Sequence, residues 1–232
     1  DQLITQTIYP AICAITDRPA RMREAFEKSN RITAMWALPF GAGLALFTPD
    51  LVDHVLGRKW EPAVPLVQLV GVSTAIYQLG FNWTAFHRAV GRTRPQTVYA
   101  IAGFVAFLAA PLPLLLAFGA EGFGWGLFAV NLTAGALRWF YMRELLPGVR
   151  IASLVARAFV PPIIACLPVL TWRAISESHT RGPVTSAVQI LLFVAVYATV
   201  TVIMERRLLT EAIGYLRRRG ITSDPAGTAS GA

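Results

Sequence analysis

Charged residues are scarce in this chain. Only 15% of its 232 residues are Asp, Glu, Lys or Arg, whereas soluble globular domains carry about 25%. Apolar residues make up 55% of the sequence. This balance argues against a soluble domain and directs attention to long apolar runs.

Residues that build disulfides and metal sites are also few, and they are dispersed. Cys13 and Cys166 lie far apart in the sequence, so we expect two small apolar side chains and no structural disulfide. His54, His87 and His179 fall in three different predicted loops, which argues against a metal site because metal ligands cluster. No nucleotide-binding loop is present. We therefore predict no metal, no cofactor and no enzymatic activity.

None of the 13 acidic residues lies at the centre of an apolar run. Transporters that use protons or sodium commonly keep a buried carboxylate, which is costly in lipid and retained for function. The sequence therefore predicts no coupling carboxylate within this chain. Coupling through partners outside the chain stays open.

Six long apolar runs dominate the sequence. A helix rises about 1.5 Å per residue and must cross about 30 Å of hydrocarbon, so about 20 apolar residues suffice. The sequence predicts an all-α polytopic membrane bundle with six transmembrane helices, at residues 32–51, 63–85, 98–118, 123–141, 151–172 and 184–204.

The positive charges alternate between the loops. Of the 21 Lys and Arg residues, all but four fall before the first run, between the second and third, around the fourth-to-fifth connection, or after the sixth. The four exceptions are Arg58, Lys59, Arg173 and Arg181. The positive-inside rule places the richer side in the cytoplasm, with both chain ends. Because the basic residues edge the spans, we expect them to meet anionic lipid and not nucleic acid.

The ends of the chain carry different patterns. Residues 1–31 are predicted to hold the end of a preceding span and then an amphipathic helix, which either lies on the inner membrane surface or connects the spans as a solvated helix. Residues 32–146 supply four spans and residues 147–204 two more. Residues 205–232 are predicted to form a basic cytoplasmic helix and a disordered tail.

Polar residues inside the runs are the candidates for a substrate cavity: Gln78, Asn82, Asn131, Arg138 and Arg157. One interpretation is structural, with amides bonding between helices and the two arginines extending toward the inner interface. The other is a hydrophilic cavity whose arginines meet an anionic substrate such as a lipid diphosphate. The sequence leaves both open.

Small residues and prolines mark where helices approach or bend. We expect close helix packing at Gly41, Gly43, Gly122, Gly124 and Gly126. The pair Pro161 and Pro162 predicts a kink in the fifth span. Such a break is tolerated where neighbours or water satisfy the freed carbonyls, so it should face protein or a cavity.

Four short segments resemble motifs of a known family. Tyr9-Pro10-Ala11, the loop from Leu56 to Ala63, the loop from Ala89 to Arg94, and the hairpin from Gly119 to Gly124 occur in the order and topology of the lipopolysaccharide and O-antigen flippases. These belong to the multidrug/oligosaccharidyl-lipid/polysaccharide exporter superfamily. The resemblance covers about residues 6–146, and the last two spans match in number and hydropathy alone.

The resemblance implies a transporter. The chain would supply spans nine to fourteen of a fourteen-span protein in the inner membrane of a bacterium. Its implied substrate is a lipid-linked oligosaccharide, translocated by alternating access of two bundles for cell-surface polysaccharide biosynthesis. Its implied partner is the N-terminal bundle, which this chain lacks.

Two alternatives belong to other classes. A multidrug-type exporter of the same superfamily would be expected to use an intramembrane carboxylate, which the runs lack. A non-transport membrane protein of glycan synthesis would be expected to cluster acids or histidines at one membrane face, and these residues are scattered.

The predicted topology can be tested by chemical labelling. A single cysteine introduced near Arg92 should react with a membrane-impermeant reagent only from the cytoplasm, and one near Glu177 only from outside, because the charge bias sets the orientation. The reverse pattern would contradict the assignment.

Overall fold

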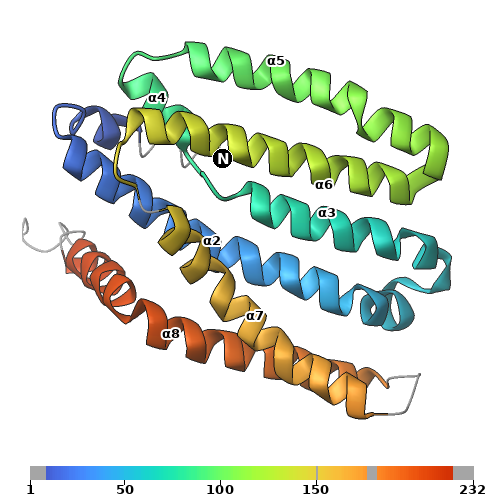
Figure 1. Ribbon diagram of the computed structural model, residues 1–232. Coiled ribbons are helices and arrows are strands. Elements are labelled where there is room, and N and C mark those ends of the chain that lie inside the picture. Colours follow the sequence, from blue (N-terminus) through green and yellow to red (C-terminus); the bar gives the residue numbers. More distant parts are fainter. Residues whose placement is uncertain (1–8, 150, 177–181, 222–232) are drawn as a thin grey trace, which may run out of the picture.

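The computed structural model describes residues 9–149, 151–176 and 182–221 (Figure 1). In this part of the chain every regular element is helical, and there is no strand. The predicted all-α class is therefore confirmed. Glu177, His179 and Arg181, the first eight residues and the predicted disordered tail lie outside the described residues.

The helices follow one another with short connections. Their bounds are α2 Pro19–Leu51, η1 Val52–Leu56, η2 Arg58–Ala63, α3 Val64–Tyr77, α4 Trp83–Ala89, α5 Arg94–Ala109, α6 Pro111–Leu145, α7 Ile151–Ile175 and α8 Pro183–Ile221.

The long helices lie side by side and roughly antiparallel (Figure 1). α5 packs on α6, α6 on α3, and α3 on α2, so these four form a row. α7 and α8 pack on each other, and both contact α2. α2 is therefore the helix that joins the row to the α7–α8 pair.

α2 is longer than one span because the predicted amphipathic stretch is its first part. The helix runs without interruption from Pro19 to Leu51, 33 residues or about 50 Å. Met22 and Phe26 are buried against Phe86 and Met142. The apolar face that was expected to lie on the membrane, or to be solvated, packs instead on protein.

Within the described residues, four helices are long and apolar enough to cross a membrane: Pro19–Leu56, Pro111–Leu145, Ser153–Ile175 and Pro183–Arg206. The other two predicted spans are divided. The second consists of α3, a turn and α4, while the third consists of α5 and the first turns of α6. A polytopic helical membrane protein is confirmed, and the number of six crossings stays a prediction.

The predicted hairpin between the third and fourth spans is present. Gly119 has φ +65° within α6, and the chain reverses there. The helical arm after Gly119 packs tightly on the arm before it. A Cβ added at Gly126 would lie only 2.4 Å from the Cα of Pro111. Side chains larger than hydrogen do not fit at this contact.

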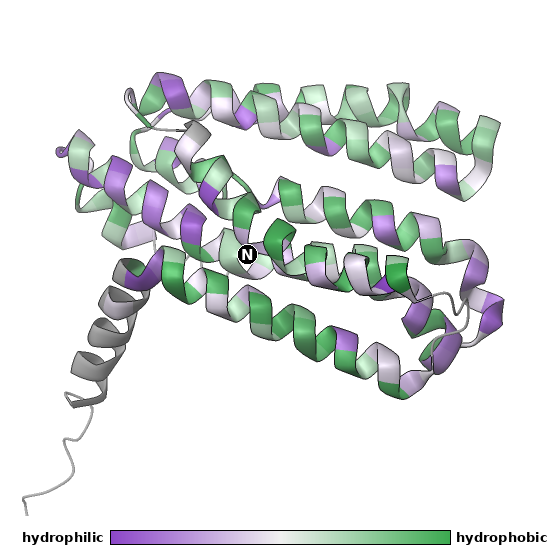
Figure 2. Cartoon of the chain, turned by 60° about the horizontal axis from the view of Figure 1, so that its bottom comes forward, coloured by the Kyte–Doolittle hydropathy of each residue, from purple (hydrophilic) through white to green (hydrophobic). Residues whose placement is uncertain are grey.

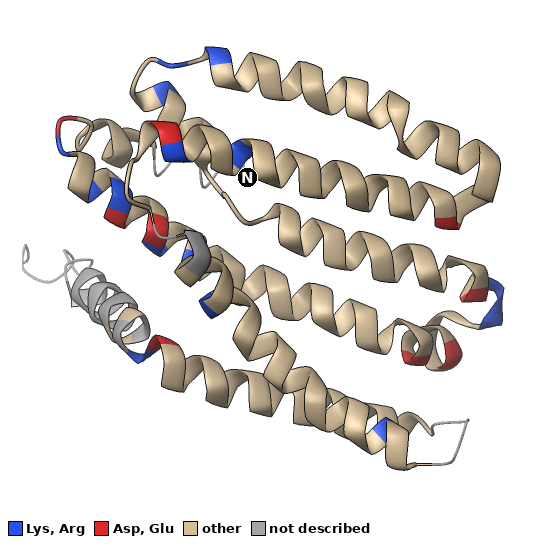
Figure 3. Cartoon of the chain, in the orientation of Figure 1, with Lys and Arg blue, Asp and Glu red and all other residues tan. Residues whose placement is uncertain are grey.

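Charge and hydropathy separate along the helix axes. Hydrophobic residues predominate along the middle of the helices, and hydrophilic residues gather toward the helix ends (Figure 2). Most of the described Lys and Arg lie at the end where α2 and α5 begin and α6 ends (Figure 3). We call this the basic end. Which side of the membrane it faces stays a prediction.

The α2–α3 contact depends on glycine. A Cβ at Gly41 would lie 2.5 Å from the Cβ of Ala75 and 2.8 Å from the carbonyl oxygen of Gly71. A Cβ at Gly71 would in turn lie 2.9 Å from the Cβ of Leu44. The two backbones therefore approach as closely as small residues in membrane helices permit.

Substitution of Gly41 should destabilise the protein more than substitution of a glycine that has room for a Cβ. We expect Gly41→Ala to separate α2 from α3 and to lower the free energy of unfolding by about 1–3 kcal/mol, as overpacked cores do. Thermal unfolding in detergent would measure this. The control is Gly135→Ala in α6, where nothing lies within 4 Å of an added Cβ. Equal unfolding temperatures for both variants would contradict the prediction.

Candidate functional site

The second predicted span is interrupted between α3 and α4. Gly80 has φ +86° and Asn82 has φ +62°, both in the left-handed region. Glycine enters this region freely, and asparagine does so more readily than other residues. We call residues 78–82 the break. Helix interruptions at membrane depth need neighbouring groups to satisfy the freed backbone, and they often border transport sites.

Asn30 of α2 satisfies one side of the break. Its Oδ1 accepts a hydrogen bond from the backbone N–H of Gly80 at 2.7 Å. Its Nδ2 donates to the carbonyl oxygens of Phe26 at 2.9 Å and Phe81 at 3.4 Å. One buried amide thus replaces helical bonds that the turn has lost.

Arg138 of α6 satisfies the other side. In an uninterrupted helix the N–H of Phe81 would reach the carbonyl of Tyr77, but it bonds to Gln78 instead. Arg138 Nη1 donates to that Tyr77 carbonyl at 2.7 Å. The guanidinium therefore caps the end of α3.

Two tyrosines hold the Arg138 guanidinium in place. Its Nε and Nη2 donate to the hydroxyl of Tyr99 at 3.1 and 2.7 Å, and its Cζ lies 3.7 Å from the centre of the Tyr77 ring. The Tyr99 hydroxyl donates to that of Tyr77 at 3.1 Å. Because Arg138 is only 5% exposed, these bonds and the aromatic face compensate for the loss of water around its charge.

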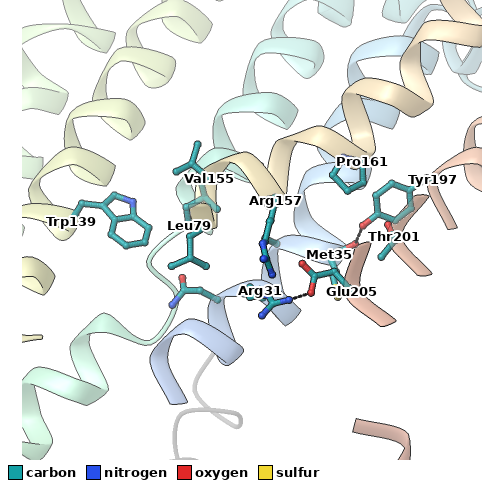
Figure 4. Close-up of a pocket in the computed structure, with 14 residues that line it drawn as sticks. Arg31, Met35, Leu79, Trp139, Val155, Arg157, Pro161, Tyr197, Thr201 and Glu205 are labelled. Carbon is teal, nitrogen blue, oxygen red and sulfur yellow. Dashed lines mark hydrogen bonds and ion pairs between the residues drawn. The ribbon is translucent and has the colours of Figure 1, made fainter. Parts of the chain in front are cut away.

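A small pocket lies beside the break at the basic end (Figure 4). Asn30 of α2, Leu79 of the break and Trp139 of α6 line it. Arg31 of α2 and Glu205 of α8 form an ion pair across it, and Arg157 of α7 completes the charged wall.

Irregularities in α7 and α8 meet at the same pocket. Pro161 and Pro162 remove the N–H groups that would donate to the carbonyls of Arg157 and Ala158. Glu205 has φ −113° and ψ 21°, which interrupts α8. Breaks or missing helical bonds in α3, α7 and α8 therefore surround one charged pocket. Whether the proline pair bends α7 stays a prediction.

A second buried charge network lies at the opposite end of α2. Arg173 Nη2 lies 2.8 Å from Asp50 Oδ2, and Arg173 Nε donates to Gln189 Oε1 at 3.0 Å. The Ser186 hydroxyl donates to Asp50 Oδ1 at 2.9 Å. This network joins α2, α7 and α8 at the end away from the basic one.

An apolar groove is lined by α2 and α3. Its volume is about 1080 Å³. Trp36, Phe40, Leu66 and Val70 line it, with Gln78 near one end.

The predicted cavity residues do not all line one cavity. Gln78 lines the groove, Asn82 lies in the break, and Arg157 lines the charged pocket. Asn131 donates to the Ser73 hydroxyl at 3.2 Å and so links α6 to α3, while Arg138 is enclosed by protein. Contact of any of them with substrate stays a prediction.

The predicted packing glycines differ in how close their neighbours are. A Cβ at Gly124 would lie 3.1 Å from Leu69 Cδ1, and one at Gly122 would lie 2.2 Å from the Leu114 carbonyl oxygen. Gly43 has more room, with Phe193 at 4.0 Å.

Sequence reasoning missed Asn30, Arg31 and Glu205. Asn30 follows Phe26 by four residues, so it stands on the apolar face of the amphipathic stretch, and this position is a signal for a buried amide. Glu205 directly follows the sixth apolar run, at the start of the predicted basic cytoplasmic helix. Its burial depends on the packing of α8 on α2, which no local pattern encodes.

Comparison with known proteins agrees with this architecture. A family described as "Polysaccharide biosynthesis protein" matches residues 1–65. An "Uncharacterized membrane protein in cps region" of Klebsiella pneumoniae is 22% identical over 218 residues, 93% of this chain and 45% of that protein. "Lipopolysaccharide biosynthesis protein WzxC" of Escherichia coli K12 is 28% identical over 78 residues, 34% of this chain and 16% of that protein.

No solved structure matches the chain. The chain spans less than half the length of the two curated relatives that it matches. Taken together, the partial family match and the two relatives support the resemblance of the chain to the polysaccharide and O-antigen flippases.

Proposed function

We propose that the chain is part of a flippase that moves a lipid-linked oligosaccharide from the inner to the outer leaflet of a bacterial inner membrane. The observation that carries this proposal is the interrupted second span, whose break is held by Asn30 and Arg138 beside a charged pocket. Broken helices around a polar site are a recurrent feature of secondary transporters.

The physical task of such a protein explains why charge belongs here. A sugar chain carrying a diphosphate cannot enter hydrocarbon without a large loss of hydration. The basic end gathers arginines where the substrate would begin its passage, if that end faces the cytoplasm (Figure 3). The remainder of the transport path is proposed to come from the rest of the protein.

The break supplies a means of movement. A continuous helix resists bending because bending would break its backbone hydrogen bonds. A turn that contains left-handed residues can absorb changes in φ and ψ. Since Asn30 and Arg138 bond the break to α2 and α6, rearrangement there would change how α3 and α4 are oriented relative to both. We propose that this rearrangement accompanies alternation between inward-open and outward-open states.

The break can be tested by substitution of Gly80 in the full-length protein. We expect Gly80→Ala to reduce export of surface polysaccharide by about tenfold or more, because a non-glycine residue at φ +86° costs about 1–2 kcal/mol and biases the turn. Surface polysaccharide and inner-leaflet lipid-linked oligosaccharide would both be quantified in a bacterium whose own flippase gene is deleted.

The matched control is Gly103→Ala in α5, where an added Cβ meets nothing within 4 Å. It should export normally at the same protein level. The proposal predicts that lipid-linked oligosaccharide accumulates inside when export falls. Normal export by Gly80→Ala would contradict the role of the break. A complete deletion that leaves export intact, or that changes only drug resistance, would contradict the flippase proposal itself.

A further inference from the structure

The charged pocket at the break contains one more cation than anions. Arg31 and Glu205 pair with each other. Arg157 lines the same pocket, and its guanidinium points toward that pair (Figure 4). Among the described residues Arg157 has no hydrogen-bond or ion-pair partner. Two guanidinium groups and one carboxylate therefore line the same pocket.

Burial is greatest for the carboxylate. The side chain of Glu205 is 4% exposed, whereas that of Arg31 is 24% exposed, and Arg157 is exposed. A carboxylate this deep is tolerated only where cations compensate for its lost hydration. Glu205 thus occupies the position that two arginines make most favourable for a negative group.

The pocket has no spare room for a second anion. Its free volume is about 20 Å³, which is space for about one water molecule. A phosphate group therefore fits only if the Glu205 carboxylate leaves. The buried hydroxyl of Thr201 lines the wall and would face the group that replaces it.

The residue that must move already stands at an interruption. α8 is helical on both sides of Glu205, but Glu205 itself has φ −113° and ψ 21°. A change of torsion at this one residue would carry the carboxylate away without unwinding further turns. Hinges of this kind are typically single residues at element ends.

We infer that Arg31 and Arg157 form a phosphate-binding site in which Glu205 is a resident counter-ion, displaced when a phosphate group enters. The phosphate can belong to an anionic phospholipid headgroup or to the diphosphate of a lipid-linked sugar. The inference rests on the proposed function only for the second of these sources. Guanidinium groups suit it because they bind phosphate through paired N–H donors.

The site can be tested with inorganic pyrophosphate as the probe. The full-length protein in a maltoside detergent, which carries no phosphate, would be titrated by calorimetry. We expect Glu205→Gln to bind about tenfold more tightly, because the competing charge is gone, and Arg157→Gln about tenfold more weakly. Arg157 is exposed, so its loss should leave the fold intact.

The control for charge is Glu144→Gln. Glu144 pairs with Arg92 on the surface of the same end, with both side chains more than half exposed. Its removal alters net charge as Glu205→Gln does, but it should change pyrophosphate affinity by less than about twofold because exposed pairs are screened. Equal effects of the two substitutions, or an unchanged affinity of Arg157→Gln, would overturn the inference.

The source of the phosphate follows from a second titration in nanodiscs that contain phosphatidylglycerol. If the Glu205→Gln variant no longer binds pyrophosphate in these nanodiscs, the lipid headgroup occupies the site. If the variant still binds pyrophosphate there, the occupant is a diphosphate. If Glu205→Gln leaves the pyrophosphate affinity unchanged while Gly80→Ala still blocks export, the phosphate site is overturned and the proposed function is not. The expected affinities together with normal export by Gly80→Ala overturn the proposed function and leave the site standing.

Discussion

The bilayer's intolerance of unsatisfied backbone groups is the constraint on which this structure depends. Hydrocarbon offers no water to a free N–H or carbonyl, so every interruption of a spanning helix needs a partner. The break at residues 78–82 obtains its partners from α2 and α6, through Asn30 and Arg138. Packing of the row α6–α3–α2 and the interruption of its middle helix are therefore interdependent, because the bonds that permit the break also fix its neighbours.

Buried charges obey the same constraint, because each needs a compensating partner. The charged residues that are buried inside the described bundle are compensated by other elements: Arg138 by tyrosines, Glu205 by Arg31, and Asp50 by Arg173. Each compensation joins helices that are distant in sequence. Polar contacts in this protein thus help to determine which helices are neighbours, together with the close glycine packing of α2 on α3 and the apolar clusters.

Much of the architecture could be predicted from local patterns, and most of the candidate site could not. Apolar runs gave the all-helical membrane class, and Gly119 lies where the reversal between two runs was expected. The division of the second span was missed because a run of apolar residues gives no sign of a turn that long-range bonds stabilise. Asn30 and Gly80 are 50 residues apart, and Glu205 is buried only because α8 returns to α2. Hydropathy describes where a segment resides, but not what it touches.

The two ion pairs on α2 restrict how the α7–α8 pair can move. Arg31 and Asp50 lie on one helix, separated by roughly 28 Å at 1.5 Å per residue, and their charges have opposite sign. Each meets a complementary charge on α8 or α7. A slide of the pair along α2 by a single turn would break both contacts at once and leave the two buried carboxylates, Asp50 and Glu205, without their cations. The two ion pairs therefore fix the axial register of α7 and α8 on α2.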